Sequence, residues 1–483
     1  MKILFTCSEV QPLVKTGGLA DVAASLPKAL AQLGHDVRIL LPAYPQAVAH
    51  CSIHARHEFE GPAGAGALLE TRLPGSDITV WLLDAVWAFQ RSGNPYLDAS
   101  GMPWADNPYR FAFLSRVAVE VARNRMALDW QPEVVHCNDW QTALVPALLT
   151  LEDERPATLF TIHNLAYQGV FSADIFQHLG LPEAFWHHQS LEFFEQVSFM
   201  KGGLVYADRI TTVSPSYALE ITGPSFGCGL DGLLRQRSHD LVGIINGVDD
   251  DEWNPAHDPH IAQRFTAQSF ENKALNSRAL RLELGLPERP DLPLVALIGR
   301  LVEQKGIDLI LDCLEAMLEL PLQLVILGSG HAAFEQALEQ AAARYPERMA
   351  IRMGYDEGLA HRIEAGANLF LMPSRFEPCG LNQMYSQKYG TLPLVHAVGG
   401  LRDTVVDADD RALLSGDATG FSFHEATGAC LLETLKRALG IWQYPDMWAR
   451  MALKGMLKDF SWEASARQYL AQYELAIQAR KSS

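Results

Sequence analysis

Three short loops combine charged residues with glycine, at residues 15–19 (KTGGL), 300–306 (RLVEQKG) and 375–381 (RFEPCGL). Each loop follows an apolar run typical of a strand and precedes a helical pattern. Loops of this kind lie at the carboxyl ends of parallel strands, where open α/β folds bind their ligands. Because the loops are divided between the two halves of the chain, the sequence predicts one ligand bound between two domains.

The loop at residues 15–19 has the features of a phosphate site. Gly17 and Gly18 let backbone amides approach an anion at a helix N-terminus, and Lys15 adds a full positive charge. The loop lacks the third glycine of the dinucleotide fingerprint and does not match the P-loop, so a tight turn that binds nothing is the alternative. Asp21, early in the next helix, either complements the helix dipole or contacts ligand hydroxyls.

The two later loops carry a pair of cations and an acid. Arg300 and Lys305 are either solvated surface charges or preorganised cations that stabilise negative charge growing on a leaving group. Glu377 precedes a helix expected to start near Gly380, where the acid either caps the helix or contacts a ligand. Cys379 is either a small buried residue or a thiol whose pKa the helix start lowers, and a contact role without covalent catalysis is favoured.

Two polar residues end strands in the first half of the chain. Asp139 follows the strand expected at 133–136, and His163 follows the one at 158–162. A single histidine at a strand end is more often structural than catalytic. The histidines at 187–188 and at 54 and 57 lack converging acids or cysteines, so no metal site is expected.

Alternating apolar runs and helical patterns predict an α/β fold. Strands are expected at 2–8, 37–41, 79–83, 133–136, 158–162 and 209–213, and a helix at 20–33 ends before Gly34. A turn-rich acidic stretch near 241–255 marks a boundary. A second series of strands follows at 294–299, 323–327, 349–353, 368–372 and 392–395. We therefore expect domains at residues 1–245 and 246–460 and a C-terminal helix at 461–483.

Composition restricts the class of protein. Hydrophobic residues make up 48% and charged residues 20% of the 483, which is ordinary for a globular protein. A formal net charge of -18 disfavours nucleic acid or an anionic membrane as partner. The seven cysteines are scattered without a close pair, and the N-terminus turns polar at once, without a signal or membrane-spanning segment. These features predict a cytoplasmic protein with reduced thiols.

The motifs, in this order and spacing, resemble those of the bacterial glycogen synthases and plant starch synthases, from residue 3 to about residue 462. The resemblance implies two Rossmann-like, doubly wound domains that face a cleft (the GT-B type), with the C-terminal helix crossing back to the first domain. It implies a retaining transferase that adds glucose from ADP-glucose to an α-1,4-glucan such as glycogen or a maltooligosaccharide, without a cofactor or metal. The first domain would hold the glucan and the second the nucleotide sugar. UDP-glucose is the alternative donor.

The resemblance also implies roles for single residues. Tyr355 would stack on the base, and the backbone carbonyl of His163 would help to stabilise an oxocarbenium-like transition state. The residues expected in catalysis are Lys15, Asp139, His163, Arg300, Lys305 and Glu377. The residues expected to bind the donor are Lys15, Gly17, Gly18, Asp21, Asn246, Arg300, Lys305, Tyr355, Glu377, Cys379, Gly380, Leu381, Gly399 and Gly400. The residues expected to bind the acceptor are Tyr96, whose alternative role is loop packing, and Asp139.

One position departs from the family pattern, and other functions remain as alternatives. Val398 stands where many relatives carry threonine, so a hydroxyl contact is lost there while the amides of Gly399 and Gly400 can still reach a phosphate. No side chain suggests a nucleophile, which favours front-face substitution in which the leaving diphosphate takes the acceptor proton. A nicotinamide-dependent oxidoreductase is one alternative, but the chain has no complete G-x-G-x-x-G. A non-catalytic glucan-binding protein is another, and it would not need Lys15, Arg300, Lys305 and Glu377 together. A phosphorylase is the third, but no lysine context suggests a pyridoxal phosphate site.

Overall fold

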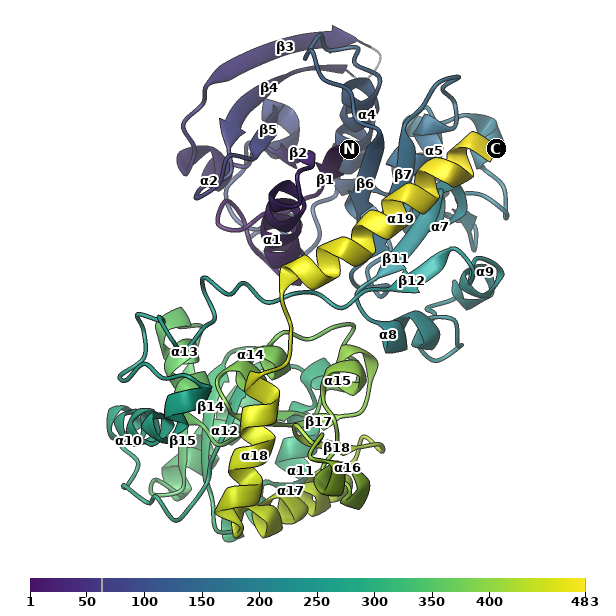
Figure 1. The fold of residues 1–483 in the computed structure, drawn as a ribbon. Coiled ribbons are helices and arrows are strands. Elements are labelled where there is room, and N and C mark those ends of the chain that lie inside the picture. The colour runs from purple at the N-terminus through teal and green to yellow at the C-terminus, as the bar shows by residue number, and fades with distance from the viewer. Residues whose placement is uncertain (62–63, 483) are drawn as a thin grey trace. The chain divides into compact units, whose positions relative to one another are not determined.

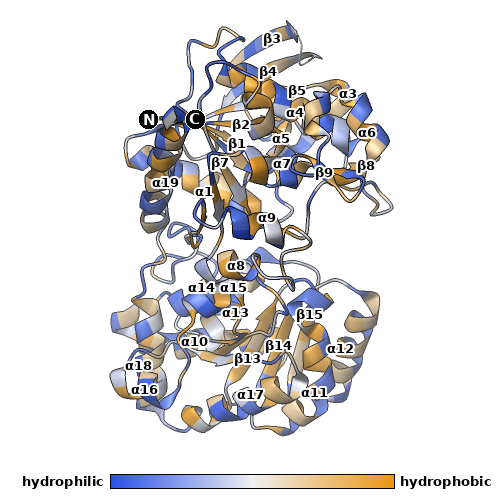
Figure 2. Ribbon diagram, turned by 90° about the vertical axis from the view of Figure 1, so that its right-hand side faces the viewer, coloured by the Kyte–Doolittle hydropathy of each residue, from blue (hydrophilic) through white to orange (hydrophobic). Residues whose placement is uncertain are grey.

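The computed structural model describes residues 1–61 and 64–482. The chain forms two compact units. Unit 1 contains Met1–Gly247 and Trp462–Ser483, and unit 2 contains Val248–Ser461. Each unit has one large sheet with helices on its faces, and Figure 2 shows the hydrophobic residues concentrated in the sheets. Among the described residues, no helix combines the length and the apolar character needed to cross a membrane.

The large sheet of unit 1 has the order β12-β11-β7-β6-β1-β2-β5-β4-β3. Its strands are parallel except where β4 pairs with β3 and β5. From β1 the chain adds β2 on one side and later β6 on the other, so the winding direction reverses between β1 and β6. The strands are β1 (Lys2–Thr6), β2 (Asp36–Pro42), β3 (Ala55–Gly61), β4 (Gly64–Arg72), β5 (Thr79–Asp84), β6 (Val134–Asn138), β7 (Ala157–Ile162), β11 (Arg209–Thr212) and β12 (Leu241–Gly243).

The central strands of unit 1 are buried because helices cover both faces of the sheet. Every residue of β6 and β7 is buried, as expected for the central strands of a parallel sheet, although both strands include polar residues. A small sheet of three short strands lies apart from the large one. The remaining main elements are α1 (Gly18–Gln32), α4 (Asn107–Ala122), α5 (Leu144–Leu149), β8 (Val170–Ser172), β9 (Glu192–Phe193), β10 (Gln196–Ser198), α7 (Phe199–Tyr206), α8 (Pro215–Glu220) and α9 (Asp231–Gln236).

The C-terminal helix α19 (Trp462–Ser482) belongs to unit 1, which confirms that the chain crosses back (Figure 1). It packs on β7 and α1. Tyr469 and Tyr473 of this helix are fully buried, and the Tyr473 hydroxyl is 2.8 Å from Nδ1 of His136 on β6. The helix therefore fills the face of the sheet opposite α5 and α7 with side chains from the far end of the chain.

Unit 2 is built on an all-parallel sheet of order β15-β14-β13-β16-β17-β18. Its winding reverses between β13 and β16. Helices α11 and α17 pack against each other on one face of the sheet, over a core of leucine, isoleucine and phenylalanine side chains. The strands are β13 (Leu294–Ile298), β14 (Gln323–Gly328), β15 (Met349–Met353), β16 (Leu369–Met372), β17 (Leu392–His396) and β18 (Phe421–Phe423). The main helices are α10 (Lys273–Leu284), α11 (Ile307–Glu319), α12 (Ala332–Arg344), α13 (Glu357–Gly366), α14 (Asn382–Lys388), α15 (Gly399–Thr404), α16 (Asp410–Ser415), α17 (Gly428–Trp442) and α18 (Pro445–Met456).

Two doubly wound α/β units are thus confirmed, and most strands lie where the apolar runs predicted them. The hairpin β3–β4 was missed because β3 contains no buried residue and β4 buries only a short stretch, so neither strand forms a long apolar run. The helix expected near Gly380 begins at Asn382, since Gly380 has φ +72° and cannot join a right-handed helix. The unit boundaries fall after Gly247 and Ser461.

Candidate functional site

The predicted site residues form two clusters, one in each unit, and each lies where the winding of its sheet reverses. In unit 1 the loop at residues 15–18 follows β1, whereas Asp139 and His163 follow β6 and β7. In unit 2 Arg300 and Lys305 follow β13, and Glu377 follows β16. Strand ends at such reversals are the usual ligand sites of open α/β sheets.

A buried glutamate that the sequence analysis did not single out holds the loop at residues 15–18. Glu9 is 3% exposed, and its carboxylate accepts hydrogen bonds from the backbone amides of Thr16 and Gly17 and from the Thr16 hydroxyl. The Gly17 amide, expected to approach a phosphate, therefore already has a carboxylate partner. Glu9 is the first acid after β1, which is the signal that could have identified it.

Lys15 lies on the surface of the same loop. Its Nζ atom is 2.6 Å from Oδ1 of Asp21 and 2.8 Å from Oε1 of Gln11, and its side chain is 45% exposed. Gly17 and Gly18 are also exposed, and Gly18 begins α1 without a side-chain cap. The loop thus presents a cation and two glycines at a helix N-terminus, as expected for an anion site.

Asp139 and His163 are brought together by neighbouring strands. The backbone N–H of His163 donates to Oδ1 of Asp139 at 2.8 Å, and Nε2 of His163 lies 2.9 Å from Oδ1 of Asn138. Burial raises the pKa of Asp139 to about 7, against the backbone hydrogen bonds that lower it. Burial lowers the pKa of His163 to about 3, which keeps its ring neutral. Asp139 has φ 54°, an uncommon backbone conformation for a residue other than glycine.

Tyr96 and Asn246 complete the predicted residues of unit 1. The Tyr96 hydroxyl is 2.5 Å from Oε1 of Glu9 and 2.8 Å from Oγ of Ser8, so it supports the carboxylate that holds the loop. Asn246 is 5% exposed, and its Oδ1 atom has no hydrogen-bond partner in the described part of the chain. An unpaired buried amide oxygen is unusual and is consistent with a ligand contact.

The cluster of unit 2 centres on an ion pair that is partly buried. Nζ of Lys305 is 2.6 Å from Oε2 of Glu377, which also accepts a hydrogen bond of 2.9 Å from Oγ of Ser374. The Glu377 side chain is only 9% exposed, whereas that of Lys305 is 26% exposed. Arg300 is exposed and contacts Oε1 of Gln304 at 3.1 Å. Burying a carboxylate against a lysine fixes both groups, and Ser374 was not predicted from the sequence.

Hydrogen bonds join the loops that carry these charges. The backbone N–H of Arg375 donates to the carbonyl of Gln304 at 2.8 Å, and Nε2 of Gln304 donates to the carbonyl of Phe376 at 3.2 Å. Gly306, in the left-handed region at φ +72°, is the N-cap residue that precedes α11. A Cβ atom there would lie 2.1 Å from the carbonyl oxygen of Pro373. The position therefore requires glycine.

Two further glycines allow the chain after β17 to contact the Glu377 loop. A Cβ atom on Gly399 would lie 2.0 Å from the Glu377 carbonyl oxygen, and one on Gly400 would lie 2.1 Å from that of Cys379. The Gly400 N–H donates to the carbonyls of Glu377 and Pro378, both at 3.2 Å. A phosphate contact through the Gly400 amide would therefore replace these bonds. Val398 precedes α15 in an extended conformation.

The remaining predicted residues of unit 2 differ in exposure. Cys379 is 5% exposed, and Leu381 precedes α14. Tyr355 is 71% exposed. A surface hollow of about 720 Å³ in unit 1, lined by Phe193, Lys201 and Arg237 among others, contains none of the predicted site residues.

Comparison with known proteins identifies the family. Residues 2–236 match the starch synthase catalytic domain, and residues 284–450 match the glycosyl transferases group 1. The chain is 55% identical to glycogen synthase 1 of Methylococcus capsulatus over 99% of this chain and 97% of the relative. It is also 55% identical to the glycogen synthase of Cellvibrio japonicus over 98% of each.

The chain belongs to the glycogen synthase family. Among solved structures it resembles the catalytic domain of starch synthase IV from Arabidopsis thaliana bound to ADP and acarbose, with 32% identity, a TM-score of 0.88 and 99% of both chains covered. A sucrose-phosphate synthase from Thermosynechococcus elongatus, 18% identical with a TM-score of 0.62, shares the fold. The expected glycosyltransferase family is confirmed, and the oxidoreductase alternative is set aside.

Proposed function

We propose that this member of the glycogen synthase family transfers glucose from ADP-glucose to the non-reducing end of an α-1,4-glucan with retention of configuration. The observation that carries the proposal is the partly buried Lys305–Glu377 pair at the β13–β16 reversal. The donor assignment is supported by the starch synthase relative, whose structure contains ADP. Unit 2 binds the nucleotide sugar, and unit 1 binds the glucan.

Lys305, Arg300 and Lys15 bind the diphosphate. Lysine and arginine side chains that are already positioned around a leaving group stabilise the negative charge that develops on it as the sugar–phosphate bond stretches. No solvent has to reorganise during this step. The protein has a net charge of -18, so these cations must create a local positive region for an anionic donor. Glu377 contacts the glucose hydroxyls while it holds Lys305 in place, and Tyr355 stacks on the adenine.

The transfer is a front-face substitution. The bond from the anomeric carbon to the diphosphate oxygen breaks, and the acceptor 4-hydroxyl attacks from the same face. The proton of that hydroxyl passes to the departing diphosphate oxygen. Asp139 orients the sugar, and the backbone carbonyl of His163 faces the positive charge of the oxocarbenium-like transition state. Because the His163 ring has a pKa lowered to about 3, it stays neutral and does not repel that charge.

Assays with purified full-length protein test this proposal. ADP-glucose and UDP-glucose are each incubated with maltooligosaccharide, with and without added Mg²⁺, while nucleoside diphosphate release and chain length are followed. We expect lengthening with ADP-glucose that does not depend on Mg²⁺. Lengthening with UDP-glucose alone would overturn the donor, and a glucosyl adduct trapped on Asp139 or Glu377 would overturn the front-face step.

We further propose that the protein acts in the cytoplasm. The seven cysteines are free thiols in the structure, from buried Cys7 to exposed Cys228, with no disulfide between them. Free thiols are typical of a reducing compartment. Fractionation of the source cells, with activity recovered from the soluble cytoplasmic fraction, is the measurement that tests this.

A further inference from the structure

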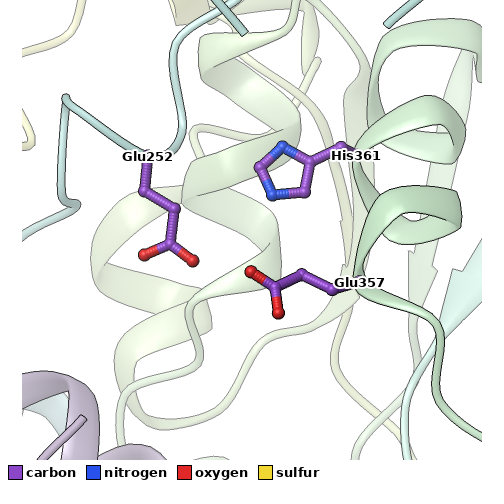
Figure 3. A group of neighbouring side chains, drawn as sticks. All are labelled: Glu252, Glu357 and His361. Carbon is purple, nitrogen blue, oxygen red and sulfur yellow. The ribbon is translucent and has the colours of Figure 1, made fainter. Parts of the chain in front are cut away.

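Three side chains with metal-binding atoms converge in unit 2, away from the Lys305 cluster. Glu357 begins α13 and His361 lies one turn later on the same helix, whereas Glu252 comes from the segment that opens unit 2. One ligand atom of each lies within 4.8 Å of the others. Figure 3 shows the two carboxylates and one ring nitrogen turned toward the same space.

The histidine of this group is buried with one nitrogen unpaired. His361 is 1% exposed, and its Nδ1 atom is 2.7 Å from Oδ2 of Asp258. Its Nε2 atom, which faces the two glutamates, has no hydrogen-bond partner among the residues that the structure describes. A buried polar atom without a partner costs free energy, so a ligand that binds Nε2 of His361 would be stabilising.

The surroundings of His361 fix its orientation. Asp258 is completely buried and also accepts hydrogen bonds from the Tyr389 hydroxyl at 2.5 Å and the His260 amide at 2.8 Å. The His361 ring stacks on Trp253 with centroids 3.8 Å apart and an interplanar angle of 10°. A carboxylate that binds Nδ1–H directs the lone pair of Nε2 outward, which is the arrangement found behind histidines that ligate metals.

We propose that Glu252, Glu357 and His361 bind one divalent transition metal ion, with Zn²⁺ as the best match. One imidazole and two carboxylates suit Zn²⁺ better than Mg²⁺ or Ca²⁺, which prefer oxygen ligands. Ligand atoms at about 2.1 Å from the ion would lie about 3.4 Å apart, so small movements of the two glutamates close the site. Water completes the coordination.

The ion has a structural role. It fastens the segment that carries Glu252 to the first turn of α13, at the point where the chain enters unit 2. Arg362, the residue after His361, donates two hydrogen bonds of 2.8 Å to the carboxylate of Glu283. Its charge is therefore paired there and does not neutralise the two glutamates of the site. This inference does not depend on the proposed transferase activity.

Zinc titration of the tag-free, metal-depleted full chain by isothermal calorimetry tests the site. We expect one tight Zn²⁺ per chain, weakened at least tenfold in Glu357→Gln and in Glu252→Gln. Glu339→Gln, an exposed change on α12, is the matched control and should bind as the parent does. A His187→Gln/His188→Gln variant removes the adjacent histidine rings of unit 1, 4.0 Å apart, and should also keep the tight site.

Thermal unfolding supplies a second readout. Zn²⁺ at 100 times the parent's Kd should raise the unfolding temperature of the parent by about 5–10 °C, and the same Zn²⁺ concentration should raise that of Glu357→Gln by at most about half as much. Absence of tight binding would overturn the proposal. Tight binding that survives both glutamate substitutions would overturn it as well.

Discussion

Replacing Lys305 by alanine tests the cluster of unit 2 most directly. At 2.6 Å and an effective dielectric constant of about 20, the gross attraction between Lys305 and Glu377 is about 6 kcal/mol. Desolvation of both groups and the partial exposure of Lys305 offset much of this attraction. We therefore expect a net loss of about 2 kcal/mol, which lowers the unfolding temperature by about 4–8 °C in calorimetry of the full chain.

The same substitution should reduce turnover more than it reduces stability. If Lys305 stabilises charge on the leaving diphosphate, its loss reduces kcat about 100-fold to 1000-fold with ADP-glucose. KM for the donor should change less, because the interaction strengthens as the bond breaks. Initial rates at saturating maltooligosaccharide measure both constants.

A control and a double variant complete the experiment. Lys436→Ala removes an exposed lysine 2.7 Å from Glu433 in the same unit, and we expect changes of less than about 0.5 kcal/mol and no loss of rate. In Lys305→Ala/Glu377→Gln the stability losses should be less than additive, because no unpaired carboxylate remains buried. A kcat of Lys305→Ala within tenfold of the parent, or strictly additive stability losses, would refute the reasoning.

Three other predictions concern single positions. Glu9→Gln removes the charge that holds two loop amides and should lower both kcat/KM for the donor and the unfolding temperature, as kinetics and calorimetry would detect. Gly306→Ala should lower the free energy of unfolding in denaturant by about 2–4 kcal/mol, because φ is positive there and the added Cβ atom would clash with Pro373. Gly416→Ala is the control: φ is +75° but no atom lies near the added Cβ, so the loss should be about 1 kcal/mol. Burial raises the pKa of the Asp139 carboxyl to about 7, so the stability that its protonated form contributes is complete below about pH 4 and is lost as pH rises through 7. Asp139→Asn carries no ionisable group there and should be more stable than the parent at pH 8, by about 4 kcal/mol in urea unfolding, because about three pKa units correspond to that free energy. A stability difference between parent and variant that is the same at pH 4 and at pH 8 would contradict this prediction.

The sequence predicted the parts of the fold that local pattern determines. Largely apolar runs identified strands such as β7, because buried parallel strands contact helices on both faces. The hairpin β3–β4 has one solvated face and weaker apolar character, and β12 is three residues long. Such elements depend on pairing with a neighbouring strand, which a single sequence does not reveal.

The predicted charged residues lie after strand ends, as the sequence indicated. The residues that pair with them in the structure could not be predicted from the sequence. Lys305 and Glu377 are 72 positions apart in sequence, and only the adjacency of β13 and β16 brings them to 2.6 Å. Glu9 was overlooked because a lone acid after a strand carries no motif. His361 was overlooked because its carboxylate partner, Asp258, is 103 positions away.

Both clusters have one feature in common: a buried glutamate accepts hydrogen bonds from donors to which we assigned the binding of an anion. Glu9 occupies the amides of Thr16 and Gly17 in unit 1, and Glu377 occupies Lys305 in unit 2. Each carboxylate holds its loop in the shape that a phosphate or sugar would need, which reduces the reorganisation at binding. Each also adds a negative charge beside the bound anion and so weakens its affinity. An enzyme of this family must release a diphosphate after every transfer. A site that is preorganised but binds the diphosphate group only moderately tightly therefore favours turnover. Binding free energy that substrate and product share equally does not lower the barrier between them.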